Sequence, residues 1–228
     1  MNHPWALAPG QHPQSFEKTI SKTVSSRFLL YLPEGYDADA TKKWPLIVFL
    51  HGSGERGDDL EQVKANGPHK LFERDHRFPF IVVSPQAPAD TSWDSDTINT
   101  LLDELTARLP VDPDRIYLTG LSLGGYGTWK IATDHPQRFA AIAPVCGGGE
   151  SDNACRLKDV PIWAFHGAKD SVVPLKEEQD MVDAVRACGG DVKFTVYPDA
   201  DHDVWTQTYA NPALYEWFLQ HRRGDAKH

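Results

Sequence analysis

The chain has 228 residues, a length that fits one α/β domain or two small ones. Hydrophobic residues make up 40% and charged residues 24% of the chain, a mixture that excludes collagen-like, low-complexity and largely disordered proteins. Acidic residues outnumber basic ones by 32 to 23, for a formal net charge of −9, so we expect neither nucleic acids nor anionic membranes as partners.

Short runs of β-branched and aromatic residues alternate with longer segments of helical periodicity along the chain. This alternation is typical of an α/β protein with a mostly parallel sheet and helices on both faces. No helix-sized segment separates the first two runs, so we expect these to form an antiparallel edge of the sheet. In all, eight strands are expected, at residues 18–23, 28–32, 46–50, 80–84, 115–119, 140–144, 162–165 and 192–197.

Three helices have clear boundaries in the sequence. The first begins after Asp94 with an acidic turn, and the second begins near Pro174 and ends at Gly189-Gly190, where glycine can adopt the left-handed cap. The third begins at Asn211-Pro212, a capping residue followed by proline at the first helical position. Its expected buried stripe is Leu214, Trp217 and Phe218.

No internal repeat, linker or shift in composition marks a domain boundary, so we expect a single domain over residues 1–228. The longest connection without a clear helical pattern, residues 147–161, is too short to hold a helical lid domain. The longest apolar run, around Pro45 to Leu50, is far below the ~20 residues needed to span a bilayer. It is therefore expected to be a buried strand.

The strongest chemical signal is Gly120-Leu121-Ser122-Leu123-Gly124, which follows a predicted strand and opens a predicted helix. The pattern G-x-S-x-G in this context is typical of a nucleophile elbow, a sharp turn that lifts the serine hydroxyl clear of the sheet. Side chains two positions away on either side would collide in such a turn, which accounts for the glycines. We therefore expect Ser122 to be a nucleophile.

A serine hydroxyl is a weak nucleophile without a neighbouring base and a group that orients the base. Asp170 and His202 each follow a predicted strand, so both are expected at the same sheet edge as Ser122. Asp201 and Asp203 flank His202 as alternative partners, but loop neighbours rarely reach the adjacent ring. Ser122, Asp170 and His202 are thus the predicted catalytic residues.

A pair of backbone amides is expected to stabilise developing negative charge on the substrate. We assign these amides to Leu123, at the start of the elbow helix, and to Ser53, in the HGSGERG loop that follows a predicted strand. The charged residues of that loop, Glu55, Arg56 and Asp58, are expected to form salt bridges that support it rather than to bind substrate.

Five motifs together, HGSGERG, PQ at 85–86, GLSLGGYGTW, HGAKD and DHDVW, resemble those of lidless α/β-hydrolases of the carboxylesterase and dienelactone-hydrolase-like group. The resemblance covers about Ser26 to Phe218. Within the group, the sequence is similar to the branch that includes polyhydroxybutyrate-depolymerase-like and feruloyl-type esterases. It implies the α/β-hydrolase fold without a lid, and substrate contacts from Trp93 and Trp205. Dienelactone hydrolases proper use cysteine as nucleophile, so a serine favours ordinary esters.

The expected function is that of a serine carboxylesterase acting on short-chain or aromatic esters, including acetyl or feruloyl esters on plant carbohydrates. Alternatives are a serine peptidase on the same fold and a catalytically silent binding protein. No metal or organic cofactor is expected, since the scattered histidines form no zinc motif. The oligomeric state and the acyl and alcohol specificity are left open by the sequence.

The remaining expectations concern redox state and location. Three cysteines are too few for a disulfide framework, so we expect reduced thiols, with a bridge between Cys146 and Cys155 as the alternative. The first residues lack the charged and apolar segments of a secretory signal. A cytoplasmic location is therefore expected unless a signal has been removed.

Overall fold

Most of the predicted strands assemble into one sheet. The computed structural model describes residues 15–36, 41–72 and 78–224. Within these ranges the sheet has seven strands in the order β1-β3-β2-β4-β5-β6-β7. The strands are β1 (Arg27–Tyr31), β2 (Trp44–Leu50), β3 (Ile81–Gln86), β4 (Val111–Leu121), β5 (Ala141–Val145), β6 (Ile162–Gly167) and β7 (Val192–Tyr197).

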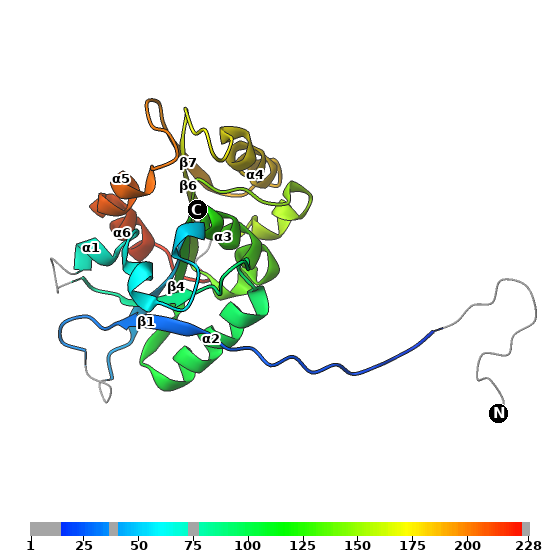
Figure 1. Ribbon diagram of the computed structural model, residues 1–228, viewed down its shortest axis with the longest axis vertical. Coiled ribbons are helices and arrows are strands. Elements are labelled where there is room, and N and C mark those ends of the chain that lie inside the picture. The colour runs from blue at the N-terminus through cyan, green and yellow to red at the C-terminus, as the bar shows by residue number, and fades with distance from the viewer. Residues whose placement is uncertain (1–14, 37–40, 73–77, 225–228) are drawn as a thin grey trace, which may run out of the picture.

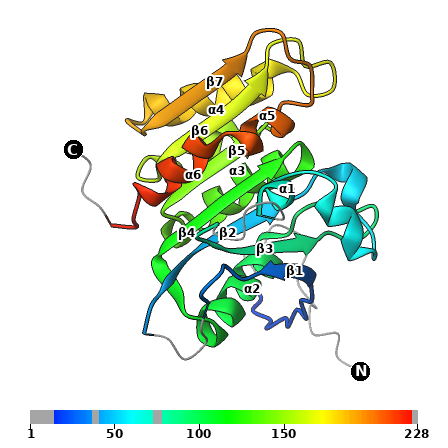
Figure 2. The same ribbon diagram turned by 90° about the vertical axis from the view of Figure 1, so that its left-hand side faces the viewer.

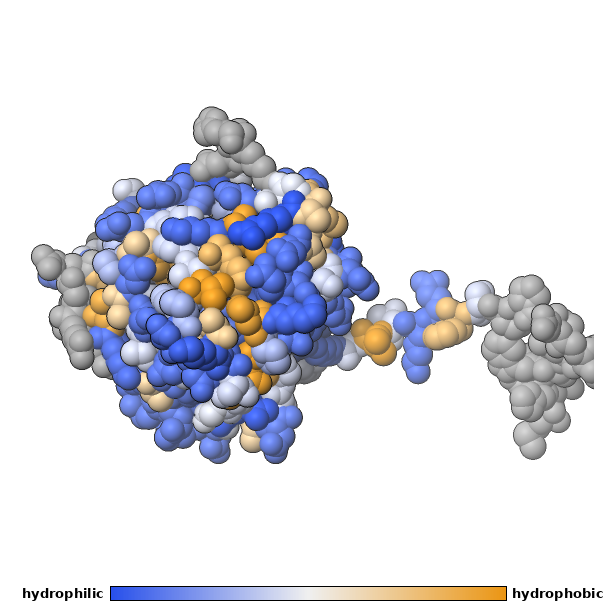
Figure 3. All heavy atoms as spheres, turned by 90° about the horizontal axis from the view of Figure 1, so that it is seen from above, coloured by the Kyte–Doolittle hydropathy of each residue, from blue (hydrophilic) through white to orange (hydrophobic). Residues whose placement is uncertain are grey.

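All neighbouring strands in the sheet run parallel except β1, which is antiparallel to β3 at one edge. The prediction of an antiparallel edge is therefore confirmed for one strand. The other predicted strand, Lys18 to Thr23, is wrong, because residues 15–26 form no strand. This segment runs outward from the body (Figures 1 and 3), where Phe16 and Ile20 are 89% and 88% exposed and no neighbouring strand completes a ladder.

Helices cover both faces of the sheet, as predicted (Figure 2). One face packs against the apolar sides of α2 (Ser95–Arg108), α3 (Leu123–Asp134) and α4 (Leu175–Ala187). The other packs against α1 (His69–Phe72), α5 (Trp205–Ala210) and α6 (Pro212–Leu219). Four short 3-10 helices lie in the connections: η1 (Ser53–Glu55), η2 (Leu60–Lys64), η3 (Pro136–Arg138) and η4 (Ser151–Leu157). In the described ranges, no helix is both long and apolar enough to cross a bilayer.

The predicted helix boundaries are confirmed. The Asp94 side chain accepts a hydrogen bond from the Thr97 amide at 2.9 Å, and the Asn211 side chain accepts one from the Ala213 amide at 3.1 Å. Gly189 has φ +78° at the end of α4, in the region that favours glycine. Along α6, Leu214 and Phe218 are buried as expected, but Tyr215 takes the place of Trp217, which is half-buried.

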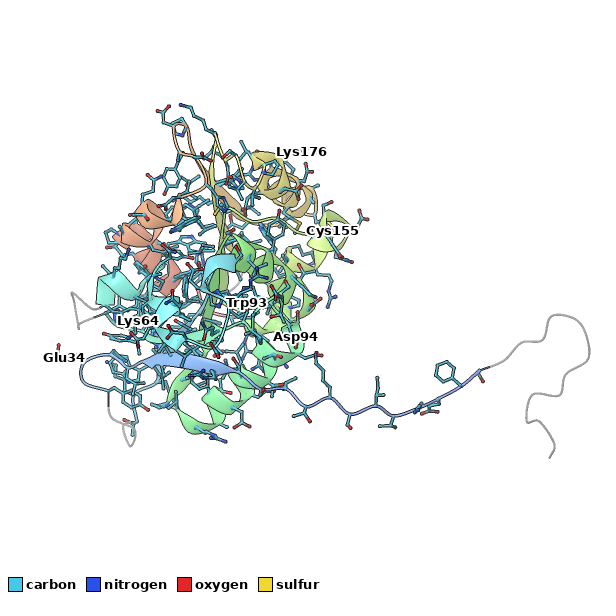
Figure 4. The ribbon with its side chains drawn as sticks, in the orientation of Figure 1. Glu34, Lys64, Trp93, Asp94, Cys155 and Lys176 are labelled. Atoms are coloured by element: carbon cyan, nitrogen blue, oxygen red, sulfur yellow. A yellow bond between two sulfur atoms is a disulfide. The ribbon has the colours of Figure 1, made fainter. Side chains whose placement is uncertain are left out.

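The cysteines differ from the expectation. Cys155, on η4 beside α4 (Figure 4), forms a disulfide with Cys188 at the end of α4, with the two Cα atoms 5.4 Å apart. Cys146 is a buried free thiol and is not bonded to Cys155. The expectation of reduced thiols was wrong because the pair is 33 residues apart in sequence and is brought together only when η4 packs against α4.

Candidate active site

The turn between β4 and α3 holds Ser122 in an unusual backbone conformation, with φ +53° and ψ −114°. Two glycines make this turn possible. A Cβ on Gly120 would lie 2.4 Å from the carbonyl oxygen of Gly124, and a Cβ on Gly124 would lie 2.0 Å from that of Leu50. Only glycine fits at either position. Backbone strain of this kind is concentrated at functional sites, and here it leaves the serine half-buried above the sheet.

The three side chains predicted to converge do so. The Nε2 atom of His202 lies 2.9 Å from Oγ of Ser122, and Nδ1 lies 2.7 Å from Oδ2 of Asp170. The other Asp170 oxygen accepts hydrogen bonds from the amides of Val172 and Val173 at 2.9 and 2.8 Å. The carboxylate is thus fixed on both oxygens and its side chain is fully buried, while the His202 side chain is 15% exposed.

The two acidic neighbours of His202 have other partners. Asp201 accepts hydrogen bonds from the amides of Ser171 and His202 at 2.7 and 2.8 Å, which ties the two loops together. Asp203 accepts from the Thr206 amide at 3.1 Å at the start of α5. The aspartate that contacts the His202 ring is therefore Asp170, as the sequence predicts.

Ser53 and Leu123 each begin a helix, η1 and α3 respectively, where the first amides have no partner within the helix. The two loops touch, since a Cβ on Gly52 would lie 2.8 Å from Cδ1 of Leu121. Their assignment as oxyanion donors stays a prediction.

The loop containing Ser53 is held by hydrogen bonds rather than by the predicted salt bridges. Asn66 donates to the buried Glu55 carboxylate at 2.6 Å, and Gln86 donates to the Glu55 carbonyl at 2.8 Å. Arg56 donates to the carbonyls of Ser53 and Thr91, both at 3.1 Å. Glu55 and Arg56 therefore support the loop, as expected, but through the Asn66 side-chain amide and two backbone carbonyls.

The two tryptophans expected to contact substrate differ. Trp93 lies inside the fold (Figure 4) and is 5% exposed. Its ring packs on that of His51 at 4.8 Å, and a Cβ on Gly127 would lie 2.6 Å from it. This burial corrects the prediction for Trp93, because the residue packs within the fold instead of lining an exposed surface. Trp205 is half-buried and packs edge-on against the His202 ring at 5.2 Å.

Sequence reasoning missed two polar residues near this site. Asn66 accepts a hydrogen bond from the indole of Trp205 at 3.1 Å and so links that ring to Glu55. Glu178 is fully buried on α4. Its spacing from Met181, Val182 and Val185 places it on the apolar face of the helix, and an acid at such a position is a signal that could have been used.

Among the residues that the structure describes, one set of side chains brings metal-binding atoms together: Cys146, Asp170 and His202, within 4.8 Å of one another. These residues do not fit a metal site. Asp170 and His202 already bond to each other at 2.7 Å. Burial raises the pKa of the Cys146 thiol well above its ordinary value, whereas a metal requires the thiolate.

Comparison with known proteins agrees with this geometry. The family model described as "Dienelactone hydrolase family" matches residues 86–212. The chain is 26% identical to a bifunctional acetylxylan esterase/xylanase of Neocallimastix patriciarum over 189 residues, 76% of this chain and 26% of that protein. It is 25% identical to a probable feruloyl esterase C of Aspergillus terreus, over 65% of this chain and 56% of that protein.

A solved structure of a thermostable esterase matches with a TM-score of 0.74 and 33% identity, over 86% of this chain and 59% of that one. The fold is thus the α/β-hydrolase fold, as the motifs implied, with seven strands in the described part of the chain rather than eight. The chain spans only about a quarter to three fifths of the length of these three proteins. On the family match and the shared fold, the chain belongs to the dienelactone hydrolase family.

Proposed function

We propose that this protein is a serine carboxylesterase in which Ser122 is the nucleophile, His202 the general base and Asp170 the group that orients it. The observation that supports the proposal is the continuous hydrogen-bonded series from Ser122 through His202 to Asp170, at 2.9 and 2.7 Å. A serine held in a strained turn at a helix N-terminus, beside a half-buried histidine, has the parts that acyl transfer needs.

In the first step, Nε2 of His202 takes the proton of Ser122 as Oγ bonds to the ester carbonyl carbon. The carbonyl becomes a tetrahedral oxyanion, which the amides of Ser53 and Leu123 would stabilise by donating hydrogen bonds. When the oxyanion collapses, His202 gives its proton to the leaving alcohol and the acyl group stays on Ser122. Water then attacks the acyl-enzyme by the same steps, which releases the acid and restores the serine.

The substrates proposed are short-chain or aromatic carboxylic esters, including acetyl or feruloyl esters on carbohydrates. The esterase activities named for the relatives from Neocallimastix and Aspergillus support this class, as does the Trp205 ring beside His202. A hollow of about 230 Å³, lined in part by Tyr126, Lys130 and Met181, lies along α3. Tyr126 lies one helical turn after Ser122, and its amide donates to the Ser122 carbonyl at 3.0 Å.

Hydrolysis of p-nitrophenyl acetate by wild type and Ser122→Ala tests the proposal. The variant is expected to lose activity by about 10⁴-fold or more, with unchanged circular dichroism, and to fail to react with a fluorophosphonate probe. Ser151→Ala, which changes an exposed serine on η4, is the matched control and should keep both properties. Retention of more than about a hundredth of the wild-type rate by Ser122→Ala would remove the serine from its role.

A panel of esters and peptide amides, read as relative kcat/KM, separates the esterase from the alternatives. Faster cleavage of amides than of matched esters would indicate a peptidase. A wild-type protein that neither hydrolyses the panel nor reacts with the probe would indicate a silent binding protein.

A further inference from the structure

Asp170 has a second histidine partner besides His202. Nε2 of His166 lies 3.3 Å from the Oδ2 atom of Asp170, the same oxygen that accepts from His202 at 2.7 Å. On the far side of the His166 ring, Nδ1 lies 3.3 Å from Oε2 of Glu178. The side chains of His166, Asp170 and Glu178 are all fully buried. The steps described above use neither His166 nor Glu178.

Both ring nitrogens of His166 face only acceptors. Nδ1 faces the Glu178 carboxylate, and Nε2 faces the Val173 carbonyl at 2.9 Å as well as Asp170. A neutral imidazole has one donor nitrogen and one acceptor nitrogen, so its lone pair would point at an oxygen. Only the imidazolium can donate on both sides. A lone pair that faces an oxygen is costly among fully buried side chains.

Glu178 is bonded as a carboxylate. One of its oxygens accepts from the indole of Trp129 at 2.8 Å, and the other accepts from the Gly147 amide at 2.6 Å. A proton on Glu178 would sit on one of these oxygens and weaken its hydrogen bond, so the proton shared with His166 belongs on the imidazole. Burial by itself lowers the pKa of His166, but its bonds to Glu178 and Val173 and the charges of Glu178 and Asp170 outweigh burial and raise that pKa.

Resting on the roles proposed above for Asp170 and His202, we propose that His166 is a positioning residue. It is a buried imidazolium, kept protonated by Glu178, that forms an ion pair with the Asp170 carboxylate and offsets part of its charge toward His202. The positive charge of His166 beside the shared oxygen weakens the attraction of Asp170 for a proton on His202. The acid limb of the activity profile is then expected at lower pH than it would be without the charge on His166.

The other ionisable groups that the structure describes near Asp170 and His202 do not supply the positive charge assigned to His166. From its own loops, His202 faces Asp201 and Asp203, whose carboxylates bond to backbone amides. From the end of β5 it faces Cys146, and from α3 the site faces Tyr126. Burial raises the pKa of the Cys146 thiol and of the Tyr126 hydroxyl, so both are neutral. Facing His166 itself, the charged groups that the structure describes are Glu178 from α4 and Asp170.

The charge of His166 can be measured directly in the wild-type protein. Nitrogen-15 spectra of the histidine rings should report both nitrogens of His166 as protonated at pH 8, where a histidine with the ordinary pKa of about 6.5 is neutral. A spectrum with one unprotonated nitrogen on His166 at that pH would overturn the inference. This measurement does not depend on catalysis, so it stands or falls apart from the Ser122→Ala result.

The effect on catalysis is tested with Glu178→Gln, which removes the charge that keeps His166 protonated. The acid limb of kcat/KM against pH should move up by about one pH unit, because Asp170 then presents its full negative charge to the base. Asp183→Asn also neutralises an acid on α4, on its exposed side, and should leave the limb where it is. A fall in kcat at every pH without a shift of the limb would reduce His166 and Glu178 to structural support and overturn the proposal.

Discussion

The contact between Gly124 and β2 gives a sharp test of how tightly the turn at Ser122 is packed. In Gly124→Ala, the new Cβ would lie 2.0 Å from the carbonyl oxygen of Leu50 and 2.6 Å from its carbon. Ordinary carbon to oxygen contacts are about 3.3 Å or longer, so the first turn of α3 must move by more than about 1 Å from β2. Both colliding groups are backbone, and neither can rotate away.

The clash should affect both stability and rate. Overpacking of this kind costs about 1–3 kcal/mol of the free energy of unfolding, and we expect the upper end because the clash is with backbone. The same movement displaces Ser122 from His202, which it meets at 2.9 Å, and displaces the Leu123 amide from the Ser53 loop. A misplacement of about 1 Å can reduce the rate by about a hundredfold.

Urea unfolding and kcat/KM on p-nitrophenyl acetate measure the two effects in one protein preparation. Gly54→Ala is the matched control, because nothing lies within 4 Å of the position that its Cβ would take and its φ is not in the left-handed range. The control should unfold within about 0.5 kcal/mol of the wild type. If Gly124→Ala kept both its stability and its rate close to those of Gly54→Ala, the steric account of the turn would be refuted.

Two further predictions concern stability. Burial lowers the pKa of His69 to about 4, so the folded protein keeps this ring neutral at a pH where the unfolded chain already binds a proton. The free energy of unfolding should therefore fall by up to about 3 kcal/mol as the pH is lowered from about 6.5 to about 4. Urea unfolding of His69→Gln should show a shallower loss in that window, and an equal slope would contradict the assignment. Cys188→Ser opens a loop of 33 residues and should lower the free energy of unfolding by about 4 kcal/mol. Reductant should have the same effect on the wild type and little effect on the variant, and an equal loss in both would argue against the bridge.

The convergence of Ser122, Asp170 and His202 could be predicted because each follows a strand of a parallel sheet, and the carboxyl ends of such strands share one edge. Local rules also located the capped ends of α2 and α6, since a capping side chain bonds to an amide two or three residues away. These features depend on neighbours in sequence or on the general geometry of the sheet.

The predictions that failed depend on contacts between distant segments. Lys18 to Thr23 has the composition of a strand, but a strand forms only where another strand lies beside it to pair with, and composition does not show this. Trp93 follows a strand as an active-site tryptophan would, yet it turns inward onto Gly127, which has no side chain to exclude it. The bond between Cys155 and Cys188 likewise requires η4 to dock on α4.

His51 and His166 show the same limit at the level of charge. Each lies at the end of a buried strand and precedes a glycine, so the sequence offers no reason to distinguish them. Nε2 of His51 accepts a hydrogen bond from the Ala87 amide at 3.0 Å, which leaves Nδ1 to donate to the Gly52 carbonyl at 2.6 Å. His51 is therefore neutral, and burial lowers its pKa.

One ring nitrogen of His51 faces the Ala87 amide, which donates to it, whereas one ring nitrogen of His166 faces the Glu178 carboxylate, which can only accept. Exchanging one donor for one acceptor changes the charge of a buried imidazole, because the ring must donate wherever its partner can only accept. Beside the loop of Ser53, a neutral ring shapes the backbone without adding charge near the proposed oxyanion site. Beside Asp170, a charged ring can tune the base. The difference arises from Glu178 on α4, a residue that helical periodicity places on a buried face but whose partner only the folded chain supplies.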